Sequence, residues 1–181
     1  MTTLLALFNF LAFEAAWFAA VTGGAAGRPW LGSLPVLCVV AIHLLLNRAR
    51  LRPEVALILA VTLFGALLET GFMGAGLIHY AGTAAGQVLP PIWIMALWFG
   101  FGTLPGASLA WLKGRWFLQA LLGAIAGPLT YWGGAKLGAA TLPPGGGALF
   151  AIGLAWALAL PAIFQLSEAI ETRYRAARSP A

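Results

Sequence analysis

The sequence predicts an all-α fold: a polytopic membrane helix bundle with six transmembrane helices and cytoplasmic N- and C-termini. Of the 181 residues, 61% are hydrophobic and only 8% are charged, whereas a soluble domain carries about 25% charged residues. The apolar stretches run unbroken over the ~20 residues that a spanning helix needs. The shorter, alternating pattern of a membrane β-barrel is therefore excluded.

Six apolar segments reach a spanning length. They lie at about 4–21, 30–46, 55–77, 92–110, 116–138 and 148–166. The connections between them are short, and the last one reads TLPPGGG, which no helix would cross in lipid. We therefore expect residues 1–166 to form a single transmembrane helical domain and residues 167–181 to form a short basic cytoplasmic tail.

The distribution of Lys and Arg predicts the orientation. Arg28 and Lys136 are the only two basic residues expected on one side of the bilayer. The other eight fall on the opposite side: Arg48, Arg50, Arg52, Lys113, Arg115, Arg173, Arg175 and Arg178. Both termini are therefore expected in the cytoplasm. The first segment lacks a basic start and carries Glu14 in its middle, so it is interpreted as a retained helix.

Prolines and glycines predict how the spans pack. Pro105, Pro128 and Pro161 each remove one backbone hydrogen bond and are expected to kink spans four, five and six. Four glycines of the fifth segment share one helical face, which lets another helix approach closely. These are Gly123, Gly127, Gly134 and Gly138.

Two carboxylates in the spans are the leading candidates for a site. Glu14 and Glu69 lie within ~3 Å of each other in depth, near the bilayer centre. An ionised carboxylate there costs about 2.5 to 3.5 kcal/mol, so both should face protein or water, and function is favoured over structure. At about 100° per residue Glu69 shares a face with Gly65 and Phe72, which predicts that it points into the bundle.

Four further residues are binding candidates: Trp17, Asn9, His43 and Tyr131. Trp17 follows Glu14 by three residues, so its indole N–H is placed to meet that carboxylate. Asn9 and Tyr131 are more often interhelical hydrogen-bond partners than ligand contacts. His43 lies one turn from the cytoplasmic end of its span, where reaching the lipid headgroups is an equally good explanation.

Enzyme chemistry has little support in the sequence. HExxH, GxSxG, CxxC and P-loop motifs are absent. The two histidines, His43 and His79, are expected on opposite sides of the bilayer, and Cys38 is the single cysteine. No metal site and no cofactor are therefore expected. Nucleic-acid binding is not expected either, and membrane lipids are the natural partners.

Three runs resemble the recurring segments of an uncharacterised bacterial family. They are NFLAFEAAWFAAV at 9–21, WFGFGTLPGASLAWL at 98–112 and GAIAGPLTYWGGAKLG at 123–138. Members of this family are small multi-pass inner-membrane proteins that carry a domain of unknown function. The resemblance covers most of the chain and implies a compact helical bundle in the bacterial inner membrane. It implies no activity.

Three functions stay open at this point. The leading one is binding or moving a lipid-like or small amphipathic molecule through a polar intramembrane cavity centred on Glu14, Glu69 and Trp17. The second is a structural or accessory membrane subunit without a transport path, with a second copy or another membrane protein as its partner. The third is an intramembrane lipid-modifying enzyme, which would need His43 and Asn9 to converge beside a nucleophile or a carboxylate.

Overall fold

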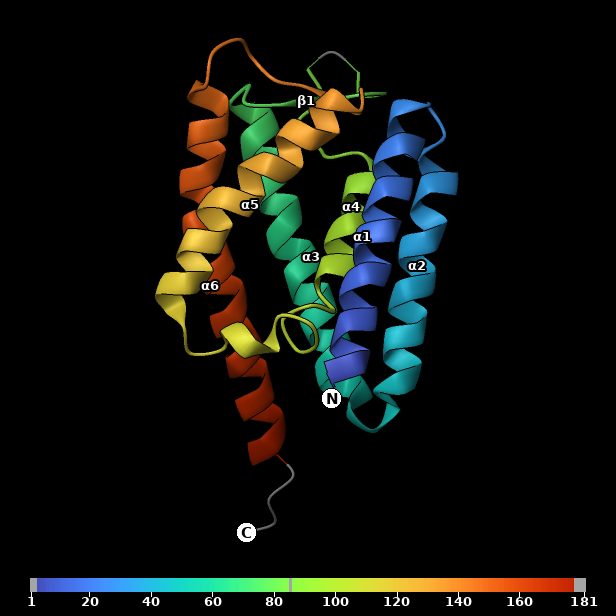
Figure 1. Cartoon of the computed structure of the whole chain (residues 1–181), viewed down its shortest axis with the longest axis vertical. Coiled ribbons are helices and arrows are strands. Elements are labelled where there is room, and N and C mark those ends of the chain that lie inside the picture. The colour runs from blue at the N-terminus through green and yellow to red at the C-terminus, as the bar shows by residue number, and fades with distance from the viewer. Residues whose placement is uncertain (1–2, 85, 178–181) are drawn as a thin grey trace.

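The computed structural model describes residues 3–84 and 86–177, and most of these residues are helical (Figure 1). The α-helices are α1 (Thr3–Ala25), α2 (Pro29–Leu46), α3 (Leu51–Gly74), α4 (Ile92–Phe101), α5 (Trp116–Lys136) and α6 (Gly147–Ala176). Two 3-10 turns, η1 (Arg48–Arg50) and η2 (Ala110–Leu112), and two short strands, β1 (His79–Tyr80) and β2 (Ala140–Thr141), connect them. The predicted all-α class is confirmed.

Four helices are long and apolar enough to cross a membrane. They are Thr3–Ala25, Pro29–Leu46, Arg48–Gly74 and Gly147–Ala176. The other two α-helices differ from the expected spans. α4 has 10 residues, or about 15 Å, which is half of a bilayer's hydrocarbon thickness. α5 has 21 residues but includes Gln119, Tyr131 and Lys136, which lower its hydropathy.

The fourth expected span, 92–110, ends early in the structure. α4 stops at Phe101 and turns follow, so Pro105 lies outside any helix and does not kink one. Gly102 marks the break, since a Cβ there would lie 2.7 Å from the Cα of Ile58 on α3. The segment after α4 is buried: Thr103 is fully covered and Leu104 is 3% exposed. Non-helical backbone of this kind is tolerated where protein covers it.

Figure 1 shows α4 between the α1–α2 pair and α3, while α5 crosses α6. The most extensive contacts join α5 to α6 and α1 to α2, and α4 contacts α1, α2 and α3. α1 begins and α6 ends at the same end of the bundle (Figure 1). At the opposite end β1 pairs antiparallel with β2, which places the α3–α4 and α5–α6 connections side by side.

Two stacked indoles connect the core to α6. Trp98 on α4 and Trp156 on α6 have ring centroids 5.3 Å apart and an interplanar angle of 13°. Each indole lies against a glycine. A Cβ on Gly65 of α3 would overlap Trp98, and a Cβ on Gly127 of α5 would lie 2.5 Å from Cγ of Trp156. Helices α3 and α5 therefore approach the aromatic pair at positions where only hydrogen fits.

The predicted glycine face of the fifth segment is only partly a packing surface. Gly123 and Gly127 pack on α6 at Trp156, as expected. Gly134 is buried but has no atom within 4 Å of an added Cβ. Gly138 lies beyond the end of α5 with φ +81°, so its role is the turn toward β2 and not helix packing. Pro128 and Pro161 do lie inside α5 and α6.

Candidate functional site

Glu69 accepts three hydrogen bonds in the interior. The hydroxyl of Tyr80 donates to Oε2 at 2.6 Å. The hydroxyl of Tyr131 and the indole Nε1–H of Trp98 donate to Oε1 at 2.6 and 3.0 Å. Glu69 is 2% exposed, so it faces the bundle as its helical phase predicts. The sequence identifies Tyr131 as a candidate but gives no sign of its partner.

The Glu69 cluster links four elements, namely α3, β1, α4 and α5. All three donors are uncharged, and no cation contributes to the cluster within the described residues. Burial raises the pKa of the Tyr80 hydroxyl well above its ordinary value, and the neighbouring Glu69 carboxylate raises it further, so Tyr80 stays protonated as a donor. A carboxylate with its acceptor oxygens occupied has little capacity left for a ligand. This geometry is typical of a structural connection.

Glu14 and Trp17 lie elsewhere. α1 packs mainly on α2 and α4, whereas α3 packs on α4 and α6, so α4 separates the helices that carry Glu14 and Glu69 (Figure 1). Glu14 is half-buried, and no described residue forms a hydrogen bond or ion pair with it. Trp17 lies near α5, where a Cβ on Gly133 would be 3.6 Å from its ring. Glu14 therefore receives no hydrogen bond from Trp17, and its helix contacts α4 more extensively than it contacts the helix that carries Glu69.

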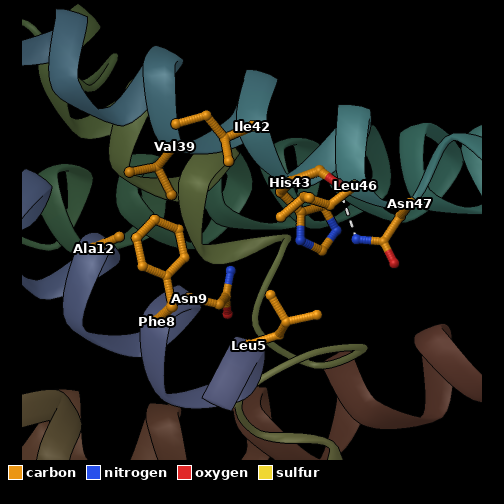
Figure 2. Close-up of a pocket in the computed structure, with 9 residues that line it drawn as sticks. All are labelled: Leu5, Phe8, Asn9, Ala12, Val39, Ile42, His43, Leu46 and Asn47. Atoms are coloured by element: carbon orange, nitrogen blue, oxygen red, sulfur yellow. Dashed lines mark hydrogen bonds between the residues drawn. The ribbon is translucent and has the colours of Figure 1, made fainter. Parts of the chain in front are cut away.

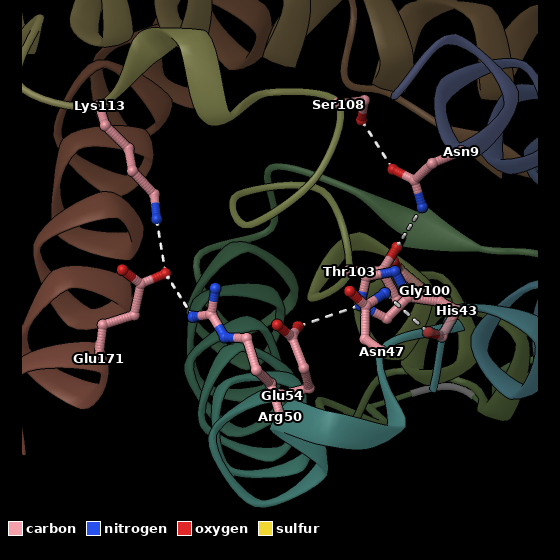
Figure 3. A network of polar contacts seen from close by, with 10 residues as sticks. All are labelled: Asn9, His43, Asn47, Arg50, Glu54, Gly100, Thr103, Ser108, Lys113 and Glu171. Atoms are coloured by element: carbon pink, nitrogen blue, oxygen red, sulfur yellow. Dashed lines mark hydrogen bonds and ion pairs between the residues drawn. The ribbon is translucent and has the colours of Figure 1, made fainter. Parts of the chain in front are cut away.

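Asn9 belongs to a second polar network, near the end where α1 begins (Figure 3). Its Nδ2 donates to Oγ1 of Thr103 at 3.2 Å, and Oγ of Ser108 donates to its Oδ1 at 2.8 Å. Thr103 in turn donates to the carbonyl of Gly100 at 2.9 Å. Asn9 thus connects α1 to the irregular segment that follows α4, which supports its interpretation as an interhelical hydrogen-bond partner.

His43 forms a buried pair with Glu54 (Figure 3). Nε2 of His43 lies 3.0 Å from Oε2 of Glu54. His43 is 6% exposed and Glu54 is 7% exposed, so the imidazole does not reach out to headgroups. The tight turn between α2 and α3 brings the two side chains to the same depth. Asn47, in this turn, donates from Nδ2 to the carbonyl of His43 at 2.8 Å and so caps the end of α2.

Asn9 and His43 line the same small pocket between α1 and α2 (Figure 2). Its volume is about 50 Å³, enough for one or two groups the size of water. Asn9, His43 and Asn47 provide its polar wall. The rest of the wall is apolar and consists of Leu5, Phe8, Ala12, Val39, Ile42 and Leu46. The pocket is therefore amphipathic, with polar groups at one side of a hydrocarbon surface.

A larger hollow of about 500 Å³ lies at the other end, beside β1 and β2. His79 and Gln87 contribute to its wall, but both are exposed and neither forms a buried polar pair. Compared with the pocket between α1 and α2, this hollow has fewer polar side chains held in fixed positions, as a binding site needs. Within 3–84 and 86–177 no group of three or more His, Cys, Asp or Glu side chains is arranged to hold a metal ion.

Sequence reasoning identified Asn9 and His43 separately but missed Glu54. Glu54 precedes the apolar run of span three and lies close to Arg50 and Arg52 in the sequence. This context is typical of a charged residue exposed to solvent. One signal was available: two spans joined by a turn of about five residues place residues equally far from the turn at equal depth. Tyr80 was missed because it lies in a connection between helices, where neither depth nor helical phase can be assigned.

A family model described as "Protein of unknown function (DUF2878)" matches residues 6–162. This match confirms the resemblance to an uncharacterised family. No curated protein matches the chain, and no solved structure matches it.

Proposed function

The chain belongs to the DUF2878 family of proteins of unknown function, and we propose that it is an integral membrane protein that binds the polar end of a lipid-like or small amphipathic molecule. The binding site is the pocket between α1 and α2. The observation that carries the proposal is the composition of this pocket: six apolar residues beside the buried polar side chains of Asn9 and His43. Such a wall matches a molecule with one polar end and one hydrocarbon part.

This assignment differs in place from the cavity expected around Glu14, Glu69 and Trp17. The oxygens of Glu69 already accept three hydrogen bonds from protein groups. A ligand there would have to displace one of them at a cost of about 1 to 3 kcal/mol. The α1–α2 pocket requires no such displacement, and its apolar residues lie on a helix pair whose outer face is apolar, with Leu45 72% and Leu4 75% exposed.

The membrane arrangement is part of the proposal. The chain crosses the bacterial inner membrane six times, with α4 and the buried segment after it forming the fourth crossing, and both termini lie in the cytoplasm. Two ion pairs support a common location for two connections and the end of α6. Glu171 on α6 lies 2.7 Å from Nζ of Lys113 and 3.1 Å from a guanidinium nitrogen of Arg50. The Arg-rich α2–α3 turn and the 102–115 segment therefore lie beside the end of α6, as the positive-inside rule requires.

Reporter fusions test the topology. A fusion after Ser179 is expected to report a cytoplasmic location, and an insertion at Gly145, between β2 and α6, a periplasmic one. An external reading at Ser179 would contradict the orientation. The same reading at both sites would contradict the six crossings, because Gly145 and the tail would then lie on one side.

Lipid analysis of the purified protein tests the binding site. Ala12→Phe, on the pocket face of α1, is expected to fill the pocket and to reduce co-purifying amphipathic ligand at least about tenfold, since a ring occupies more than the 50 Å³ available. The matched control is Ala15→Phe, on the exposed face of the same helix. Mass spectrometry of both variants gives the result. Equal ligand content in the two variants would contradict the pocket and favour an accessory subunit without a ligand.

A lipid-modifying enzyme is the second candidate, and one specific observation favours it. His43 and Asn9 do converge on one pocket, and the carboxylate of Glu54 lies 3.0 Å from the imidazole. A histidine oriented by a carboxylate is the arrangement that general bases use. An enzyme would convert its bound lipid, so a change in the mass of an added lipid, lost in His43→Gln, distinguishes it from a binding protein.

A further inference from the structure

The two ring nitrogens of His43 have different surroundings. Nε2 faces Oε2 of Glu54 at 3.0 Å. Nδ1 has no hydrogen-bond partner among residues 3–84 and 86–177, and the ring forms part of the pocket wall (Figure 2). Both side chains are more than nine-tenths buried. The pair is therefore held in place by the fold, and the second nitrogen, which has no protein partner, belongs to a ring that lines the pocket.

The carboxylate of Glu54 determines which nitrogen carries the proton of a neutral imidazole. A carboxylate oxygen only accepts hydrogen bonds, so Nε2 keeps the proton and donates it to Glu54. Nδ1 is then left with a lone pair. The same logic fixes the tautomer of metal-binding and catalytic histidines, where the partner of one nitrogen sets the role of the other.

We infer that Nδ1 of His43 is a fixed hydrogen-bond acceptor and that the polar end of the ligand carries a hydroxyl group. This inference rests on the proposed function and names its ligand class. A phosphate or carboxylate without a proton offers only acceptors, and it would face both a lone pair and the charge of Glu54. A cationic headgroup would bring a charge beside six apolar residues, which is costly.

Asn9, on α1, provides a second polar group to the pocket. Its Oδ1 accepts from Ser108 and one hydrogen of its Nδ2 is donated to Thr103, so a second amide hydrogen has no partner in the described part of the chain. A hydroxyl both donates and accepts, and so satisfies His43 and Asn9 together. The volume of about 50 Å³ accommodates a hydroxymethyl group but not a sugar. The alkyl chain lies outside, over the exposed side chains of Phe8 and Leu46.

Nitrogen-15 NMR of histidine tests the tautomer. The chain has two histidines, and His79→Gln, at an exposed site, leaves His43 as the only signal. In nanodiscs, the spectrum is expected to show a protonated Nε2 and an unprotonated Nδ1. A neutral ring protonated on Nδ1, or a ring protonated on both nitrogens, would overturn the inference.

The same signal reports ligand choice. Dodecanol and dodecyl methyl ether have equal apolar chains, but only the alcohol donates a hydrogen bond. The alcohol is expected to shift the Nδ1 resonance at a membrane concentration about tenfold lower than the ether, the ratio expected for one buried hydrogen bond. Equal shifts from both compounds overturn the hydroxyl inference and leave the pocket itself standing. No shift from either contradicts the proposed function as well.

Glu54→Gln is the matched control, because it changes the group that faces Nε2 of His43. The melting temperature of this variant shows whether it is still folded. The glutamine amide presents either an oxygen or an NH₂ group to Nε2. The preference for dodecanol over the ether should therefore depend on which nitrogen of His43 carries the proton. The preference persists if Nδ1 stays unprotonated and disappears if Nδ1 becomes protonated. A variant that is protonated on Nδ1 and still prefers dodecanol would overturn the inference.

Discussion

Replacing Glu69 with leucine is expected to lower the melting temperature of the detergent-solubilised protein by roughly 10 °C or more. The change leaves the donors of Tyr80, Trp98 and Tyr131 without their acceptor in a buried site. Each orphaned buried donor costs about 1 to 3 kcal/mol, and a chain of this size loses about 2 to 4 °C per kcal/mol. Thermal unfolding followed by fluorescence of the native tryptophans measures the effect.

Glu69→Gln makes the test informative even if the leucine variant does not accumulate. The glutamine retains one acceptor oxygen, but its NH₂ group faces a donor that Oε1 or Oε2 previously satisfied. A smaller loss of stability is therefore expected. Glu14→Gln is the control, because no described residue forms a hydrogen bond with Glu14. If Glu69→Gln and Glu14→Gln melt alike, the cluster is not a structural connection.

The glycines that face the stacked indoles are expected to be equally intolerant. Gly65→Ala places a methyl group against Trp98, and Gly127→Ala places one 2.5 Å from Cγ of Trp156. The indole rings would have to shift to admit the methyl group, so each change should cost about 1 to 3 kcal/mol by overpacking. That corresponds to a fall in melting temperature of about 2 to 12 °C.

Gly71→Ala is the matched control on α3, since nothing lies within 4 Å of a Cβ at Gly71. Because alanine is the better helix former by about 1 kcal/mol, this variant should melt at the same temperature or higher. Trp156→Phe, combined with Gly127→Ala, should recover part of the lost stability. Identical melting of Gly71→Ala, Gly65→Ala and Gly127→Ala would show that α3 and α5 do not approach the indoles as closely as described.

The sequence was sufficient for the parts of the fold that depend on local pattern. Long apolar runs predict α1, α2, α3 and α6, and helical phase predicts that Glu69 points inward; both agree with the structure. The length of α4 was predicted wrongly, because hydropathy continues through residues 102–110 although the helix does not. The break reflects the close approach of Gly102 to Ile58 and the following Pro105, and the former is a tertiary contact.

Partners across the bundle could not be predicted in the same way. Glu69 and Tyr131 are 62 residues apart, and Asn9 and Thr103 are 94 apart. Depth alone places such residues at a common level without saying which helices are neighbours. The equal depth of Glu14 and Glu69 illustrates this limit, since α4 lies between their helices (Figure 1). His43 and Glu54, 11 residues apart across a tight turn, are the pair that sequence reasoning could have found.

The pocket between α1 and α2 is proposed to hold the polar end of an amphipathic molecule. This proposal can be tested by an electron cryomicroscopy structure of the protein, purified in nanodiscs formed from its own membrane. Non-protein density is expected that contacts His43 and Asn9 and continues as a chain over Phe8 and Leu46. A well-resolved pocket that contains only water, with ordered lipid at other faces of the bundle, would contradict it.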